Sequence, residues 1–135
     1  MSNALYDLGR QAFLDADIDW SADTIKLVLV DAADYTISLS THDNLDDIPS
    51  VARVATSAAL SSKTSTNGVA DAADVTLSSV TGDPSELIIL YKDTGTESTS
   101  KLICAIDTAT GLPVTPGGGN ITITWDNGAN KIFKL

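Results

Sequence analysis

Apolar residues in this sequence gather in runs no longer than a β-strand, and turn-forming residues separate the runs. Ile25–Val30 and Leu87–Tyr91 are dense apolar runs, typical of strands buried on both faces. Residues 35–40 and 121–125 instead alternate apolar and polar side chains, which is the period of a half-exposed strand. The sequence therefore predicts a mostly-β fold, an antiparallel β-sandwich or barrel, with one short N-terminal helix.

Turn signals predict how several of these strands are joined. Asn67-Gly68 supplies the positive φ angles of a tight hairpin. Lys101–Ile106 is expected to pair antiparallel with Leu87–Tyr91 across a polar loop. The chain is expected to turn at 126–128 and return as Lys131–Leu135 beside the strand at 121–125. We expect this apolar end to be paired in the sheet or packed against a partner. Weaker strands are predicted at 51–60 and 61–69, and Val75 and Leu77 precede a turn at 81–84.

The first residues predict a helix. Leu5, Leu8 and Phe13 recur at helical spacing, Ser2 or Asn3 is a candidate N-cap, and acidic residue 7 suits the first turn. A short helix with one apolar stripe is not stable alone, so it must dock on the body of the domain or on a neighbouring subunit. The interpretation is one domain over residues 1–135, with a helical arm at 1–16 and a β body at 24–135.

Charge and size limit the function. The chain has 135 residues and a net charge of −10, and a surface this acidic repels the phosphates of nucleic acids and anionic membranes. Hydrophobic residues make up 43%, which argues against global disorder. The first residues have neither a basic leader nor an apolar stretch of signal-peptide length, so we expect a soluble protein made in a cytoplasm.

No catalytic motif is complete in the sequence. His42 beside Asp43 resembles a base with its orienting carboxylate, but no nucleophile elbow accompanies it, which favours a solvated loop histidine. Gly117–Gly119 is not followed by Lys-Ser/Thr and opens a strand, so it is a flexible loop and not a phosphate cradle. Paired carboxylates for sugar hydrolysis lack an obvious aromatic platform. We therefore predict no catalytic residues, no cofactor and no enzyme activity.

Acidic residues offer one metal alternative. Asp15, Asp17 and Asp19 resemble the opening of an EF-hand loop, but Trp20 and Lys26 stand where that loop needs Gly and Glu. We predict no metal site. A weak calcium site is the alternative, formed by these three carboxylates or by Asp43, Asp46 and Asp47.

Cys104 is the single cysteine, so no intrachain disulfide is possible. Its neighbours Ile103 and Ala105 favour a small buried hydrophobic side chain.

Several short segments, spread over most of the sequence, resemble those of a known protein family. They are Asn3–Asp7 with Gly9-Arg10 and Phe13-Leu14, Ile18–Trp20, Ile25-Lys26, Ala52–Ala55, Gly68–Val75, Tyr91–Gly95, Asp107–Val114, Trp125–Asn130 and Ile132-Phe133. In these segments the chain resembles a family of small virion structural proteins of tailed bacteriophages.

The resemblance implies a capsid decoration (cement) protein that stabilises the head by binding across capsid subunit junctions. Its expected partners are the major capsid protein and copies of itself, as a trimer, with no direct contact to nucleic acid or membrane. The expected location is the capsid surface of the virion, after synthesis in the host bacterial cytoplasm. The alternative is a tail, baseplate or fibre component in host attachment, with loops 93–100 and 111–119 reaching a host glycan. A non-viral carbohydrate-binding module is a third reading, disfavoured by the few exposed aromatics.

Partner contacts are expected mainly in the N-terminal helix and the terminal strand, and a charged residue in a weak strand suggests an ion pair at an interface. The candidate contact residues are Leu5, Leu8, Phe13, Trp20, Arg53, Ile132, Phe133 and Leu135.

Overall fold

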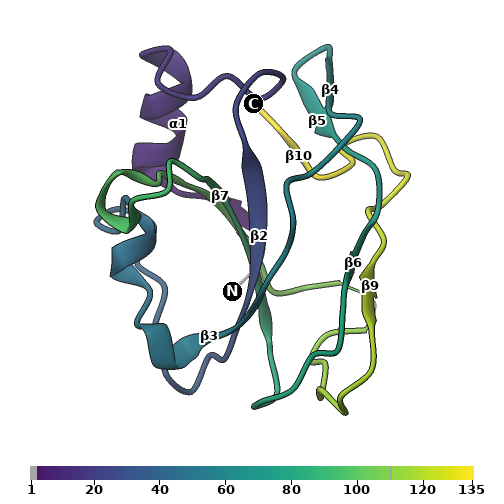
Figure 1. The fold of residues 1–135 in the computed structure, drawn as a ribbon. Helices are drawn as coiled ribbons and strands as arrows, with labels where there is room; N and C mark the ends of the chain where they lie inside the picture. The colour runs from purple at the N-terminus through teal and green to yellow at the C-terminus, as the bar shows by residue number, and fades with distance from the viewer. Residues whose placement is uncertain (1–2, 110) are drawn as a thin grey trace.

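The computed structural model describes residues 3–109 and 111–135 (Figure 1). Strands dominate it, every strand pair is antiparallel, and α1 (Asp7–Leu14) is the one α-helix within those ranges. The predicted mostly-β fold with one short helix is confirmed.

A five-stranded sheet forms the centre of the molecule, in the order β1-β8-β7-β2-β3. Its strands are β1 (Ala4–Leu5), β2 (Ile25–Val30), β3 (Arg53–Thr56), β7 (Leu87–Lys92) and β8 (Leu102–Ile106). Leu27 and Leu29 point into one core and Val28 and Val30 into another, because successive side chains of a strand face opposite sides. The dense apolar runs are therefore buried on both faces, as predicted, and the pairing of β7 with β8 is confirmed.

A second layer of short strands covers one face of this sheet, on the right in Figure 1. It contains β4 (Thr64–Thr66), β5 (Val69–Asp71) and β10 (Phe133–Lys134), and beside them β6 (Val75–Leu77) and β9 (Ile121–Ile123). Asn67 and Gly68, both at positive φ, join β4 to β5 in the predicted tight turn. The two layers enclose the larger core.

Irregular segments cover the opposite face of the central sheet. They include three short 3₁₀ helices, η1 (Leu45–Asp47), η2 (Ser50–Ala52) and η3 (Glu97–Thr99). Residues 35–40 lie here too, and they do not form the predicted strand. Their backbone carbonyls instead accept hydrogen bonds from a turn and from the start of the helix. The His42 N–H donates to Ser38 O, and the Asp7 N–H donates to Leu39 O. The apolar side chains of the alternation still pack on the sheet.

The helix begins later than the sequence suggests. Ala4 and Leu5 pair with β8 as β1, so α1 starts at Asp7, which lies in the first turn as expected. Asn3 does not cap the helix, because its Oδ1 accepts the N–H groups of residues 107 and 108. Ser2 lies outside the described residues. The edge of β8 offers the N-terminal residues ladder hydrogen bonds that a helical start would lack.

The terminal strand pairs with a different partner from the predicted one. β10 lies beside β5 and β9 beside β6, so 121–125 and 131–135 do not form a hairpin with each other. Between the pairs Ala70–Phe133 and Val75–Ile123 the chain has four residues on one side (71–74) and nine on the other (124–132). The longer connection, residues 124–132, forms a loop that contains the predicted turn at 126–128. The expected pairing of the chain end in a sheet is confirmed.

Candidate functional site

Exposed apolar side chains lie at the end of α1 and at the end of the chain. The rings of Phe13 and Phe133 contact each other, with centroids 5.9 Å apart, and this contact joins the helix to β10. Next to it in sequence, Leu14 is 87% exposed and Leu135 58%. Figure 1 places the C-terminus at the same end of the molecule as the end of α1. We call Phe13, Leu14, Phe133 and Leu135 the terminal patch.

Trp20 holds the terminal patch onto the core. Its ring meets the ring of Phe133 edge to face at 5.2 Å, and its Nε1–H donates to Thr64 O (3.0 Å) and Asp71 O (3.3 Å). Only 6% of Trp20 is exposed. This core position accounts for the tryptophan without a partner molecule.

The other apolar candidate contacts divide between core and surface. Leu5 is buried and pairs in register with Cys104 of β8. Leu8 and Ile132 are half-buried, and Phe133 is buried. Of the candidate contact residues, Leu135 is the one with a large exposed apolar side chain, and Leu14 is an exposed residue that the sequence analysis missed. The apolar stripe predicted for the helix does not include Leu14. Its exposure follows from its place as the last residue of α1, which the structure shows.

Arg53 makes its ion pair within the chain. Its guanidinium binds both carboxylate oxygens of Glu97, at 2.6 and 3.1 Å, and donates to the carbonyls of Ile48 and Leu45. The Arg53 side chain is 15% exposed. The hydrogen bond and charge of Arg53 lower the pKa of Glu97. The predicted carboxylate partner therefore exists, and it ties β3 to η1 and η3.

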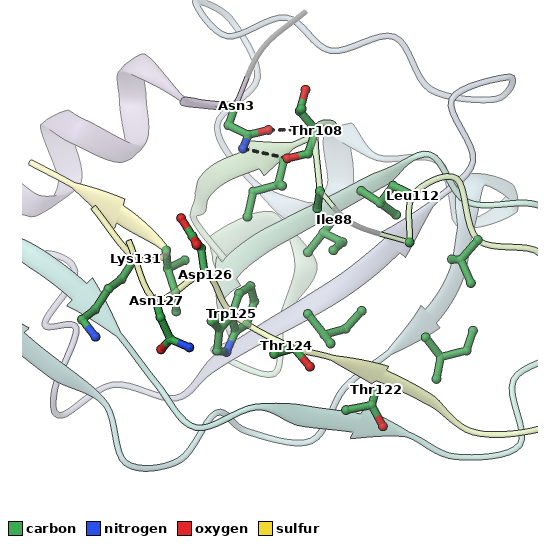
Figure 2. Close-up of a pocket in the computed structure, with 17 residues that line it drawn as sticks. Asn3, Ile88, Thr108, Leu112, Thr122, Thr124, Trp125, Asp126, Asn127 and Lys131 are labelled. Atoms are coloured by element: carbon green, nitrogen blue, oxygen red, sulfur yellow. Dashed lines mark hydrogen bonds between the residues drawn. The ribbon is translucent and has the colours of Figure 1, made fainter. Parts of the chain in front are cut away.

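A cavity of about 1,010 Å³ lies between the central sheet and β9 (Figure 2). We call it the β9 groove. Its apolar lining is Ile88, Ile106, Leu112, Val114, Ile121, Ile123, Trp125 and Ile132. Its polar lining includes Asn3, Thr108, Thr122, Thr124, Asp126, Asn127 and Lys131.

Hydrogen bonds fix the walls of the β9 groove. Trp125 is held from both ends, because its backbone N–H donates to Asp74 Oδ1 (3.0 Å) and its Nε1–H to Ala73 O (3.1 Å). On the opposite wall the Asn3 side chain binds the backbone of Thr108, as Figure 2 shows. The groove is therefore preformed, and an occupant would meet fixed walls.

His42 is half-buried and hydrogen-bonded, so its interpretation as a solvated loop residue is wrong. Its ring stacks on Tyr35, and Nδ1 lies 2.7 Å from the Tyr35 hydroxyl, which lies 3.0 Å from that of Tyr6. The Ser38 N–H also points at Nδ1, so Nδ1 accepts and Tyr35 donates. Burial raises the pKa of Tyr6 and Tyr35. Asp43 contacts Lys101 instead (3.9 Å).

Two groups of carboxylates lie close enough together to face one ion. Asp43, Asp46 and Asp47 are one, as in the calcium alternative, and Asp31, Asp34 and Asp83 are the other. Asp47 Oδ2 already accepts the backbone N–H groups of residues 43 and 44.

The acidic segment after α1 is organised differently. Asp15, Asp17 and Asp19 form no such group within the described ranges. Asp19 closes a turn by accepting from Ser21 and Ala22, which lowers its pKa.

Cys104 is buried in β8, as predicted, and burial raises its pKa to about 12. Because the thiolate is the reactive form, we expect native protein at pH 8 to resist alkylation by iodoacetamide. Protein unfolded in urea should react within minutes at the same pH. Mass spectrometry after timed labelling checks this, and rapid labelling of the native protein would contradict the buried position of β8.

Asp93 contributes an acid-sensitive contact. The Lys26 ammonium lies 2.7 Å away and the Gly95 N–H donates to Asp93, so the pKa of Asp93 falls below 3.8. A lowered folded-state pKa gives stability that is present above about pH 4 and is lost as pH falls through the folded value. Between pH 5 and pH 2, we expect the free energy of unfolding to fall less for the Asp93→Asn variant than for the wild type. The difference should be under about 1 kcal/mol, since the pair is partly exposed. Urea unfolding at each pH measures it, and parallel pH profiles would contradict it.

No family model matches the chain, and no curated protein matches it significantly. Within the described part of the chain, no helix has the length and apolar character needed to cross a bilayer.

Proposed function

We propose that this chain is a structural protein of a tailed-bacteriophage virion, and that it decorates the capsid across subunit junctions. The terminal patch carries the proposal, since it contains Leu14 and Leu135, two of the three exposed large apolar side chains among the described residues; the third is Val51 on η2. The resemblance of most of the sequence to phage virion proteins supports it. In this proposal the patch presses on the major capsid protein and on neighbouring copies in a trimer.

The two exposed leucines can supply part of the binding energy of each copy on the capsid. Burying a leucine side chain contributes about 1.5–3 kcal/mol, so Leu14 and Leu135 form the apolar centre of a modest interface. A specific interface buries about 1,200–2,000 Å² in total, so polar residues around the patch must make up its rim. The net charge of −10 favours a position outside a shell that is filled with phosphate.

The proposal is tested by adding purified protein to expanded capsids that lack it and measuring occupancy by sedimentation. Leu14→Glu combined with Leu135→Glu should weaken binding at least tenfold, because about 1.4 kcal/mol corresponds to a factor of ten. Val51→Glu is the matched control, since Val51 is 68% exposed on η2 and lies outside the patch. Equal binding by both variants would contradict the role of the patch.

Copy number separates decoration from the tail alternative. Quantitative mass spectrometry of purified particles should find the chain at a ratio to the major capsid protein near that of a repeated shell component. A handful of copies per particle, together with adsorption of the purified chain to host cells, would favour a tail, baseplate or fibre component.

A further inference from the structure

The second layer of the sandwich has an open edge beside the β9 groove. β9 pairs with β6 on one side, and among residues 3–109 and 111–135 no strand pairs with its other side. Facing it, the central sheet ends in β1, which has two residues. Backbone groups along an unpaired edge are a template for another strand. The groove thus lies where one more strand would complete the layer.

The groove carries few of the charges that keep sheet edges apart, since Asp126 and Lys131 are its charged lining residues. Residues 108–125 contain no Asp, Glu, Lys or Arg, although the chain has 18 acidic and 8 basic residues. Natural proteins usually protect open edges with charged side chains or proline. β9 itself has the sequence Ile-Thr-Ile, with neither. Its Ile121 and Ile123 line the groove together with Ile88 and Ile106 of the central sheet.

The residues that the structure describes do not themselves provide the missing strand. The described ends of the chain are already paired, β1 with β8 and β10 with β5. Among the described residues, the exposed large apolar side chains are those of Leu14, Val51 and Leu135, and they lie in a helix, in a 3₁₀ helix and at the end of a paired strand. The described residues therefore leave the place beside β9 open to a strand of another polypeptide.

We propose that the β9 groove accepts an extended strand from a different virion polypeptide, which pairs with the open edge of β9. This inference rests on the proposed function and names the form of the partner. Every second side chain of the strand enters the groove and is aliphatic, because strand side chains alternate and the lining is apolar. Basic residues flank the strand, because Asp126 lines the groove and the chain carries −10. Lys131 also lines the groove, but its charge is balanced by Asp71, 3.3 Å away.

The size of the groove agrees with this occupant. Five residues of extended chain span about 17 Å and present two or three side chains to one face. A volume of about 1,010 Å³ is at the upper end of the roughly 300–1,000 Å³ range of ligand pockets, so it has room for them.

The test uses a fluorescein-labelled nine-residue peptide in which valine and threonine alternate between terminal lysines. Anisotropy titration should show saturable binding to the wild-type chain. A peptide of the same sequence with N-methylated backbone amides should bind at least tenfold more weakly, because it cannot complete the ladder. Hydrogen exchange followed by NMR should show new protection at those amides of residues 121–124 that point to the open edge of β9.

Two variants locate the binding site. Leu112→Glu places a charge in the groove at a half-buried loop position, and it should weaken peptide binding at least tenfold. Val51→Glu makes the same kind of change on η2, remote from the lining residues, and it should bind like wild type. Circular dichroism melts confirm that both variants are folded.

Several results would overturn the proposal: no saturation at millimolar peptide, equal binding of the N-methylated peptide, or equal weakening by both variants. Self-association of the protein that Leu112→Glu abolishes would also overturn it, because the occupant would then be a second copy. A failure of the proposed function would give a different pattern of results. If wild type binds the peptide but not expanded capsids, the groove proposal of strand binding stands and the capsid role fails. If wild type binds capsids but not the peptide, the reverse holds.

Discussion

Replacing Phe133 with alanine is expected to remove about 3–5 kcal/mol from the free energy of unfolding. Phe133 is buried between Trp20 and Phe13, so its loss leaves a cavity where the helix, the loop after it and β10 meet. A small domain has only about 5–15 kcal/mol in total, so the variant should unfold at a much lower urea concentration. Equilibrium urea unfolding followed by tryptophan fluorescence measures the change.

Leu135→Ala is the matched control for this prediction. Leu135 is in the same terminal strand region but 58% exposed, and surface substitutions usually stay within about 0.5 kcal/mol. Deleting residues 131–135 should destabilise at least as much as Phe133→Ala, because it also removes the pairing with β5. A loss below about 1 kcal/mol for Phe133→Ala would mean that the terminal strand does not pack as described.

Local patterns in the sequence predicted the strands that are buried on both faces and the turn at Asn67-Gly68, because those features depend on neighbouring residues alone. Apart from the pairing of β7 with β8 and the hairpin of β4 and β5, they did not predict which strand pairs with which. β10 pairs with β5, and not with β9, across a connection of nine residues (124–132), whereas the connection between β5 and β6 has four (71–74). This difference in length can be seen only when both strand registers are known. Residues 35–40 alternate like a strand but find no neighbour to pair with, since the turns at Ser38 and Leu39 use their backbone groups.

The candidate contact residues show the same limit. Helical spacing and an apolar chain end indicated the two elements that meet at Phe13 and Phe133. The two elements differ within themselves in burial, since Phe133 of the terminal strand is enclosed whereas Leu14 at the end of the helix is exposed. The β9 groove was not predicted, because its lining comes from segments between residues 3 and 132 that no local pattern brings together. An uncharged stretch over 108–125 was the one signal of it in the sequence.

The Gly9→Ala variant tests how α1 sits on the sheet. A methyl group at Gly9 would lie 2.5 Å from the carbonyl oxygen of Leu102 and 3.1 Å from that of Ile103, which are backbone atoms of β8. Neither atom moves unless the helix or the strand shifts. In an exposed helix the same change stabilises by about 1 kcal/mol. Here overpacking should reverse the sign, and we expect a loss of about 1–3 kcal/mol in the free energy of unfolding.

Gln11→Ala provides the comparison on the solvent side of the same helix. Gln11 is exposed and makes one long hydrogen bond, 3.3 Å, to Asp15, so this variant should stay within about 0.5 kcal/mol of wild type. A clear loss of stability for Gly9→Ala beside little change for Gln11→Ala would establish that the glycine is required by the close approach of α1 to β8. If Gly9→Ala instead raises stability as in a free helix, the helix does not lie against β8, and the terminal patch loses the element that positions Phe13 and Leu14.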